Sequence, residues 1–152
     1  MSTAADAGGD KPPARVVVDA NTLISAAIGS KKTPPADIYT MVDRALASTT
    51  VVIVCPRLLD ETERSFSKRK LARLVHPDEV QDVMKWILGG SKLVADPSRI
   101  ERVCRDPKDD YIVALAREQR ATIVSGDADL LVLKKTAPVP ILSPREYLDL
   151  TA

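Results

Sequence analysis

The chain has 152 residues, of which 45% are hydrophobic, 28% charged and only 3% aromatic, and its formal net charge is +1. This length and composition are typical of one globular domain with an aliphatic core. They exclude a chain-wide positive field of the kind that strongly basic nucleic-acid-binding proteins carry, and no apolar stretch reaches the length of a membrane span.

Residues 1–13 are small, polar and rich in Pro and Gly, so we expect a disordered tail, followed by a single domain over residues 14–152. Cys55 and Cys104 belong to no CxxC motif. We therefore expect both thiols to be reduced in a cytoplasmic protein, and the alternative is one long-range disulfide.

Strand-like and helix-like segments alternate along the first half of the chain. Short β-branched runs predict buried strands, and apolar residues at helical spacing predict helices. The expected elements are a strand at Arg15–Val18, a helix at Asn21–Ile28, a loop at Ser30–Pro35, a helix at Ala36–Ala47, a strand at Val51–Val54 and a helix at Arg57–Lys68.

The same alternation continues to the end of the chain. The expected elements are a helix from Pro77 to Leu88, a strand at Lys92–Ala95, a helix at Asp109–Gln119, a strand at Thr122–Val124, a helical turn at Asp127–Leu131, a strand at Val139–Leu142 and a helix that begins at Ser143–Pro144. This order predicts an α/β protein with three layers, α/β/α, around a central, mostly parallel sheet of four to five strands.

Acidic residues stand where several of these elements begin or end. Asp19 follows the first strand and Asp127 follows the strand at Thr122–Val124. Asp106, Asp109 and Asp110 precede a helix, and Glu61 and Glu63 lie early in the helix after the second strand. Because ligands bind at the carboxyl ends of parallel strands, these acids are expected at one edge of the sheet.

Each of these acids also has an ordinary structural interpretation. Asp19 with Asn21 can cap a helix, Asp109 and Asp110 suit a helix N-terminus, and Asp127 and Asp129 suit a turn. Glu61 and Glu63, taken alone, suit solvated helix positions. The hypothesis of a site depends on the acids acting together.

A shared pocket for these acids favours a cation. Two carboxylates about 4 Å apart repel by roughly 4 kcal/mol at an effective dielectric constant of ~20. A divalent ion removes this penalty, and ligands that are all oxygen select Mg²⁺ or Mn²⁺ over zinc. Such ions activate water for attack on phosphorus, so the pattern indicates phosphodiester chemistry.

The motifs VVVDANTLISA, CPRLLDETERSF, DPKDDYIVALA and IVSGDADLL, in this order, resemble those of the PIN-domain nucleases over about Arg15 to Leu148. The resemblance implies a PIN-like fold and Mg²⁺- or Mn²⁺-dependent cleavage of single-stranded RNA. It implies that the catalytic, metal-binding acids are Asp19, Glu61, Asp109 and Asp127. Supporting acids would be Asp106, Asp110 and Asp129, and the polar groups that hold the acids in place would be Asn21 and Ser125.

The last two motifs are most similar to bacterial PIN proteins that are the toxins of toxin–antitoxin pairs, which implies a cognate antitoxin protein as partner. One group of basic residues consists of Lys68, Arg69, Lys70 and Arg73. These side chains could line the path of the RNA or form an ordinary solvated surface. The helix from Pro77 to Leu88, with Trp86 beside its apolar face, could form a homodimer contact or simply pack on the core.

Two other classes of protein have compatible sequences. One is a catalytically silent module that binds RNA or protein through the same pocket. The other is an aspartyl-phosphate phosphotransfer domain, which also gathers acids at a sheet edge but needs an Asp nucleophile and normally a Lys near a late strand end. Here the first motif is DAN, and Lys134 and Lys135 follow LLVL.

Overall fold

The computed structural model describes residues 11–152 and contains a five-stranded sheet in the order β3-β2-β1-β4-β5. Every pair of neighbouring strands is parallel, with Val17 opposite Ile53 on one side and Ile123 on the other. The strands are β1 Arg15–Val18, β2 Val51–Val54, β3 Ser91–Leu93, β4 Thr122–Val124 and β5 Ile141–Leu142. The predicted central parallel sheet is confirmed.

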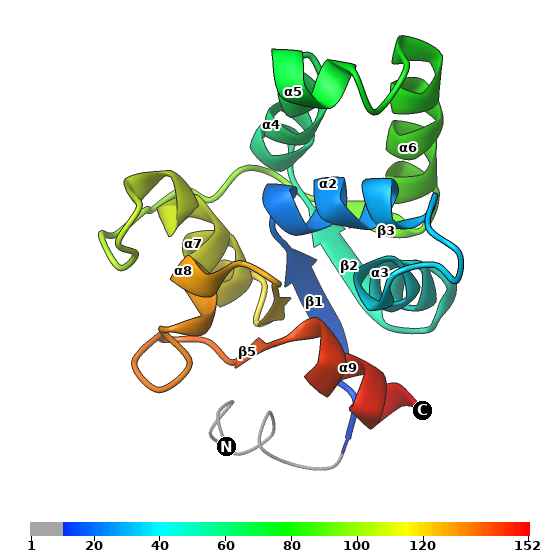
Figure 1. Cartoon of the computed structure of the whole chain (residues 1–152). Coiled ribbons are helices and arrows are strands. Elements are labelled where there is room, and N and C mark those ends of the chain that lie inside the picture. Colours follow the sequence, from blue (N-terminus) through cyan, green and yellow to red (C-terminus); the bar gives the residue numbers. More distant parts are fainter. Residues whose placement is uncertain (1–10) are drawn as a thin grey trace.

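Helices flank this sheet in the three-layer arrangement that the alternation predicts (Figure 1). Helix α7 packs on β1 and β4, whereas α3 packs on β2 and also contacts α2 and α9. The helical segments are α2 Ala20–Gly29, α3 Asp37–Ala47, α4 Pro56–Phe66, α5 Arg69–Ala72, α6 Pro77–Gly89, the 3-10 helix η1 Pro107–Asp109, α7 Asp110–Glu118, α8 Ala128–Leu131 and α9 Pro144–Thr151.

Several helices begin where local chemistry favours a helix N-terminus. A proline occupies the first helical position of α4, α6 and α9, where its missing N–H costs nothing. Ser143 and Glu146 form a reciprocal capping box at α9, which confirms the predicted start of that helix. His76 and Glu79 form the same arrangement at α6.

Other boundaries differ from those predicted. The helix expected at Arg57–Lys68 ends at Phe66, and a further short helix, α5, follows it. The strand expected at Val139–Leu142 is reduced to Ile141–Leu142, since Pro140 has no N–H and contributes to the ladder only as an acceptor from Ile123. A 3-10 turn precedes α7, and β3 begins and ends earlier than expected.

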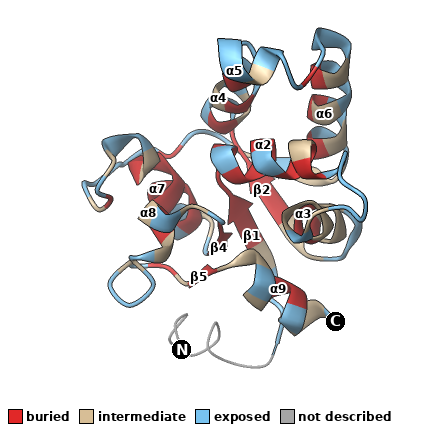
Figure 2. Cartoon of the chain, viewed as in Figure 1, coloured by how far each residue is buried: buried red, intermediate tan, exposed pale blue. Residues whose placement is uncertain are grey.

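The core is aliphatic, as the composition predicts, and it lies on both faces of the sheet (Figure 2). Trp86 is part of this packing, because its ring stacks on Tyr39 with centroids 5.6 Å apart and its indole N–H donates to Asp43. Within residues 11–152, none of the helices is long and apolar enough to cross a membrane. Most of the tail predicted to be disordered, residues 1–10, lies outside the described part of the chain.

The strand order places a reversal point at the β1–β4 boundary. From β1 the chain proceeds to β2 and β3 on one side, and then returns to add β4 and β5 on the other side. In open parallel sheets, the loops after two such strands diverge and leave a crevice at the carboxyl edge. Asp19 directly follows β1, and Asp127 lies three residues after β4.

Candidate metal centre

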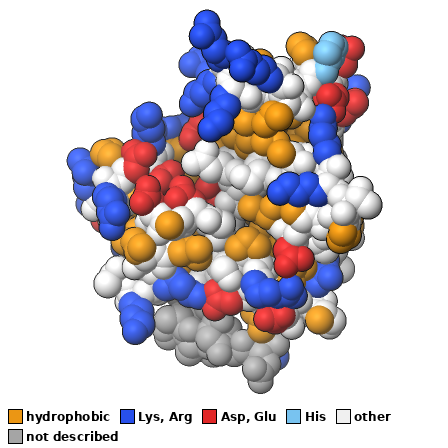
Figure 3. Space-filling model, viewed as in Figure 1, with side chains coloured by type: hydrophobic (Ala, Val, Ile, Leu, Met, Phe, Trp, Pro, Cys, Tyr) orange, Lys and Arg blue, Asp and Glu red, His pale blue; other side chains and the backbone are white. Residues whose placement is uncertain are grey.

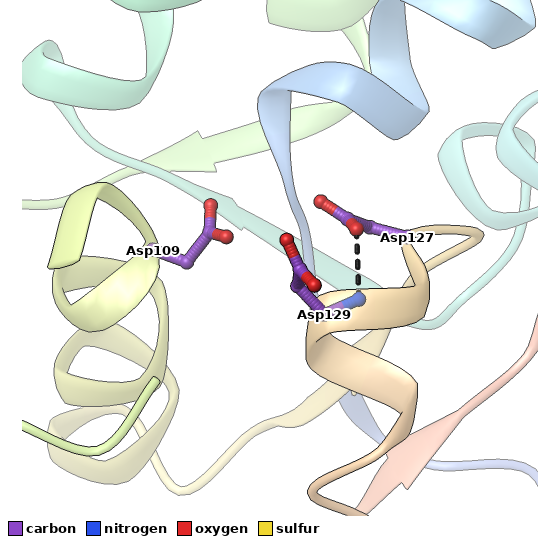
Figure 4. A group of neighbouring side chains, drawn as sticks. All are labelled: Asp109, Asp127 and Asp129. Carbon is purple, nitrogen blue, oxygen red and sulfur yellow. Dashed lines mark hydrogen bonds between the residues drawn. The ribbon is translucent and has the colours of Figure 1, made fainter. Parts of the chain in front are cut away.

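Three carboxylates meet at this edge of the sheet. Asp109, Asp127 and Asp129 each present an oxygen within 4.8 Å of the others. Figure 4 shows Asp109 pointing from the start of α7 toward Asp127, the N-cap of α8, and Asp129, in the first turn of α8. Asp127 also caps α8, because its Oδ1 accepts a hydrogen bond of 2.9 Å from the Asp129 N–H. The space-filling view shows a group of acidic side chains, in red, on this face near α7 (Figure 3).

Asp19 lies deeper, with only 2% of its surface exposed. Its Oδ1 accepts a 2.5 Å hydrogen bond from the Thr22 hydroxyl, whereas its Oδ2 is buried without any hydrogen-bond partner. The Thr22 hydroxyl also accepts from the Gly126 N–H at 3.0 Å. Ser125 in turn accepts from the Asp127 N–H at 2.9 Å, so a hydroxyl network joins the start of α2 to the β4–α8 turn.

The charges at this edge are mutually unfavourable without a counterion. Burial, followed by the charges of Asp127 and Asp19, raises the pKa of Asp109 to about 7. Burial also raises the pKa of Asp19, although the hydrogen bond from the Thr22 hydroxyl opposes this shift. An unpartnered buried oxygen beside three close carboxylates suits a hard cation with oxygen ligands. The residues present therefore fit Mg²⁺ or Mn²⁺.

Glu61 approaches from α4, and its Oε2 accepts a 2.7 Å hydrogen bond from the Tyr111 hydroxyl. Its charge adds to the rise in the pKa of Asp109. Burial, and then the Glu61 carboxylate, raise the pKa of Tyr111, so its hydroxyl remains a proton donor. Glu63 is exposed on the same helix and accepts from Gln81 instead.

Two of the expected supporting acids have structural partners. Asp110, predicted to support the site, is buried with the 102–105 loop: its Oδ1 accepts from the N–H groups of Val103 and Cys104, and its Oδ2 pairs with Arg102. Asp106 caps η1 through a hydrogen bond from the Lys108 N–H. Only Asp129 among the three joins the close group of carboxylates.

Of the two polar residues expected to hold the acids in place, only one lies in the site. Ser125 is buried and belongs to the hydroxyl network, whereas Asn21 is exposed. Sequence reasoning missed Thr22 and Tyr111. The sequence did contain a signal for Thr22, since a residue three positions after a helix N-cap lies beside it. Tyr111 carried no local signal, because its partner Glu61 is 50 residues away.

Basic residues lie around the acids rather than among them. Arg105 is the nearest, with its Nη1 3.9 Å from Asp129 Oδ1 and most of its side chain exposed. Four exposed side chains, predicted to line the RNA path, lie at the α4–α5 end of the molecule: Lys68, Arg69, Lys70 and Arg73. Figure 3 shows a blue group over α5, on the same face as the carboxylates.

Comparisons with known proteins agree with this architecture. A family model described as the PIN domain matches residues 15–129. An uncharacterised protein of Methanocaldococcus jannaschii is 25% identical over 125 residues, which cover 82% of this chain and 78% of the relative. Among solved structures, this chain is similar in fold to a chain of VapBC2 from Rickettsia felis, whose crystal structure contains a DNA fragment from the VapBC2 promoter. The two chains align with a TM-score of 0.58 and 13% sequence identity. The alignment covers 85% of this chain and 98% of the VapBC2 chain.

Proposed function

The chain belongs to the PIN-domain family, and from this premise we propose that it is an endoribonuclease that hydrolyses single-stranded RNA with Mg²⁺ or Mn²⁺. One observation carries the proposal: acids from separate segments converge at the carboxyl edge of the sheet, although their charges oppose one another. Folding does not require such an arrangement, and it is unfavourable unless a cation binds.

We assign the ion to Asp19, Asp109 and Asp127, with Asp129 and Glu61 as further ligands that would hold it directly or through water. When bound, such an ion lowers the pKa of water and neutralises charge on phosphate oxygens. The Thr22 hydroxyl fixes the Asp19 carboxylate, and the Ser125 hydroxyl fixes the backbone of Asp127 by accepting from its N–H. The cationic group at the α4–α5 end binds the RNA backbone on the approach to the site.

The proposal is tested with purified protein and a fluorescent single-stranded RNA in Mg²⁺, in Mn²⁺ and in EDTA. Cleavage should require a metal and fall at least a hundredfold in Asp19→Asn and Asp127→Asn, while circular dichroism remains that of the wild type. Asp78→Asn is the matched control, since this aspartate is exposed at the start of α6. Equal cleavage by the wild type and both site variants would show that the activity comes from elsewhere.

We further propose that the enzyme is the cytoplasmic toxin of a toxin–antitoxin pair. Motif resemblance supports this proposal, as does the likeness in fold to a VapBC2 chain. The free cysteines Cys55 and Cys104 suit a reducing compartment. Co-expression with the protein encoded beside it should yield a complex that purifies as one species and does not cleave RNA. A free, fully active protein would contradict the pairing.

The two alternative classes make different predictions in the same assays. A silent binding module would retain RNA affinity but show no metal-dependent cleavage. A phosphotransfer domain would be labelled on Asp19 by a phosphodonor. The burial of Asp19 and the pairing of Lys134 with Glu146 on α9 both oppose that chemistry.

A further inference from the structure

We infer that Tyr111 is a positioning residue for the site, because it holds the Glu61 carboxylate toward the other acids. The inference rests on the proposed function, since it concerns the same metal centre. Glu61 is not one of the three close carboxylates. It is carried by α4, a helix separate from the β4–α8 turn and from α7.

A glutamate on a helix surface has three rotatable side-chain bonds and no reason to keep one direction. Here the hydroxyl of Tyr111 removes that freedom with a 2.7 Å hydrogen bond to Oε2. Hydrogen bonds to an ionised carboxylate are stronger than neutral ones. This bond fixes the plane of the carboxylate, and we expect the free oxygen, Oε1, to reach the ion or a water on it.

The donor is itself held rigidly. Tyr111 is 1% exposed, and the guanidinium of Arg57 lies 4.3 Å from the centroid of its ring. Arg57 and Glu61 are four residues apart on α4, so they project from the same side of that helix. One α4 residue thus covers the face of the ring while another accepts from its hydroxyl. The N-terminal turn of α4 is anchored in addition, because the Arg57 N–H donates to Asp96.

A ligand held in advance loses less entropy when the ion binds, and the loss of such an outer partner typically lowers metal affinity or activity by 10–100-fold. The direct test is Tyr111→Phe, which keeps the ring and its stacking with Arg57 and removes only the hydroxyl. Calorimetric titration with MnCl₂ should give a Kd about tenfold weaker than that of the wild type. In RNA cleavage, kcat should fall about tenfold while KM for RNA stays unchanged.

Tyr147→Phe is the matched control. Tyr147 is equally buried, on α9, and its hydroxyl has no hydrogen-bond partner in the structure. This variant should keep the wild-type Mn²⁺ affinity and kcat. A change of the same size in both variants would mean that any buried tyrosine hydroxyl matters, and would overturn the inference.

A double-mutant cycle then separates positioning from simple structural support. If Tyr111 acts through Glu61, then Tyr111→Phe should have no further effect on the Mn²⁺ Kd in a Glu61→Gln background. Additive losses would overturn the inference. If the wild type binds Mn²⁺ but cleaves no RNA, only the proposed function is refuted. The Kd values for Mn²⁺ would then still decide the role of Tyr111. If the wild type binds no Mn²⁺, the proposed function and the role of Tyr111 are both refuted.

Discussion

Replacing Asp109 with asparagine should stabilise the metal-free protein, although it removes a proposed ligand. The side chain of Asp109 makes no capping hydrogen bond at α7, so Asp109→Asn breaks no such contact. What it removes is a carboxylate whose pKa rises from 3.8 to about 7 through burial and the neighbouring acids. Above pH 7 this group is charged in both the folded and the unfolded state, and only the folded state carries the penalty.

The size of the effect follows from linkage. A rise of about three pKa units corresponds to roughly 4 kcal/mol, and solvent screening of a half-buried carboxylate reduces this to about 1–2 kcal/mol. Between pH 7 and pH 4 the folded state takes up the proton first, so the wild type gains stability as the pH falls. The advantage of Asp109→Asn should therefore be about 1–2 kcal/mol at pH 8 and mostly lost at about pH 4, near the pKa of the unfolded carboxyl.

The assay is urea denaturation of both proteins in EDTA at pH 8 and at about pH 4, repeated at pH 8 with saturating MnCl₂. The metal should reverse the order, since it stabilises the wild type more than the variant. Asp60→Asn is the control, because Asp60 is exposed on α4 and pairs with Arg64. A variant that is less stable than the wild type at pH 8 in EDTA, or equally favoured at both pH values, would refute the account of opposed charges.

Three further outcomes test other parts of the site. Thr22→Val should cost about 1–3 kcal/mol of unfolding free energy, because it leaves Asp19 without its hydroxyl donor, and urea denaturation measures this directly. Asp110→Ala should cost about 2–3 kcal/mol, more than Asp106→Ala at about 1 kcal/mol, because the buried Asp110 carboxylate accepts from two backbone N–H groups of the 102–105 loop. Equal losses would contradict that role. The third change replaces the basic group by glutamine at Lys68, Arg69, Lys70 and Arg73. The KM for RNA should rise and its dependence on salt should weaken, with kcat unchanged. An unaltered salt dependence would mean that the RNA binds elsewhere.

The sequence by itself determined the sheet and the edge at which the acids gather. Runs such as Val51–Val54 are strands with the bounds predicted, because β-branched residues buried on both faces leave few other conformations. The position of Asp19 at a strand end followed from the same pattern. Prolines and capping residues set the starts of α6 and α9, since their chemistry is local.

Only the tertiary structure decided which neighbours of a motif face the crevice. Asp109 and Asp110 are adjacent in sequence, yet one points at Asp127 and Asp129 while the other is buried with the 102–105 loop. Successive residues at a helix start project about 100° apart, so one of the two must turn away. The bond between Tyr111 and Glu61 joins residues far apart in the chain, and such a contact depends on how α4 and α7 pack, which no local pattern encodes.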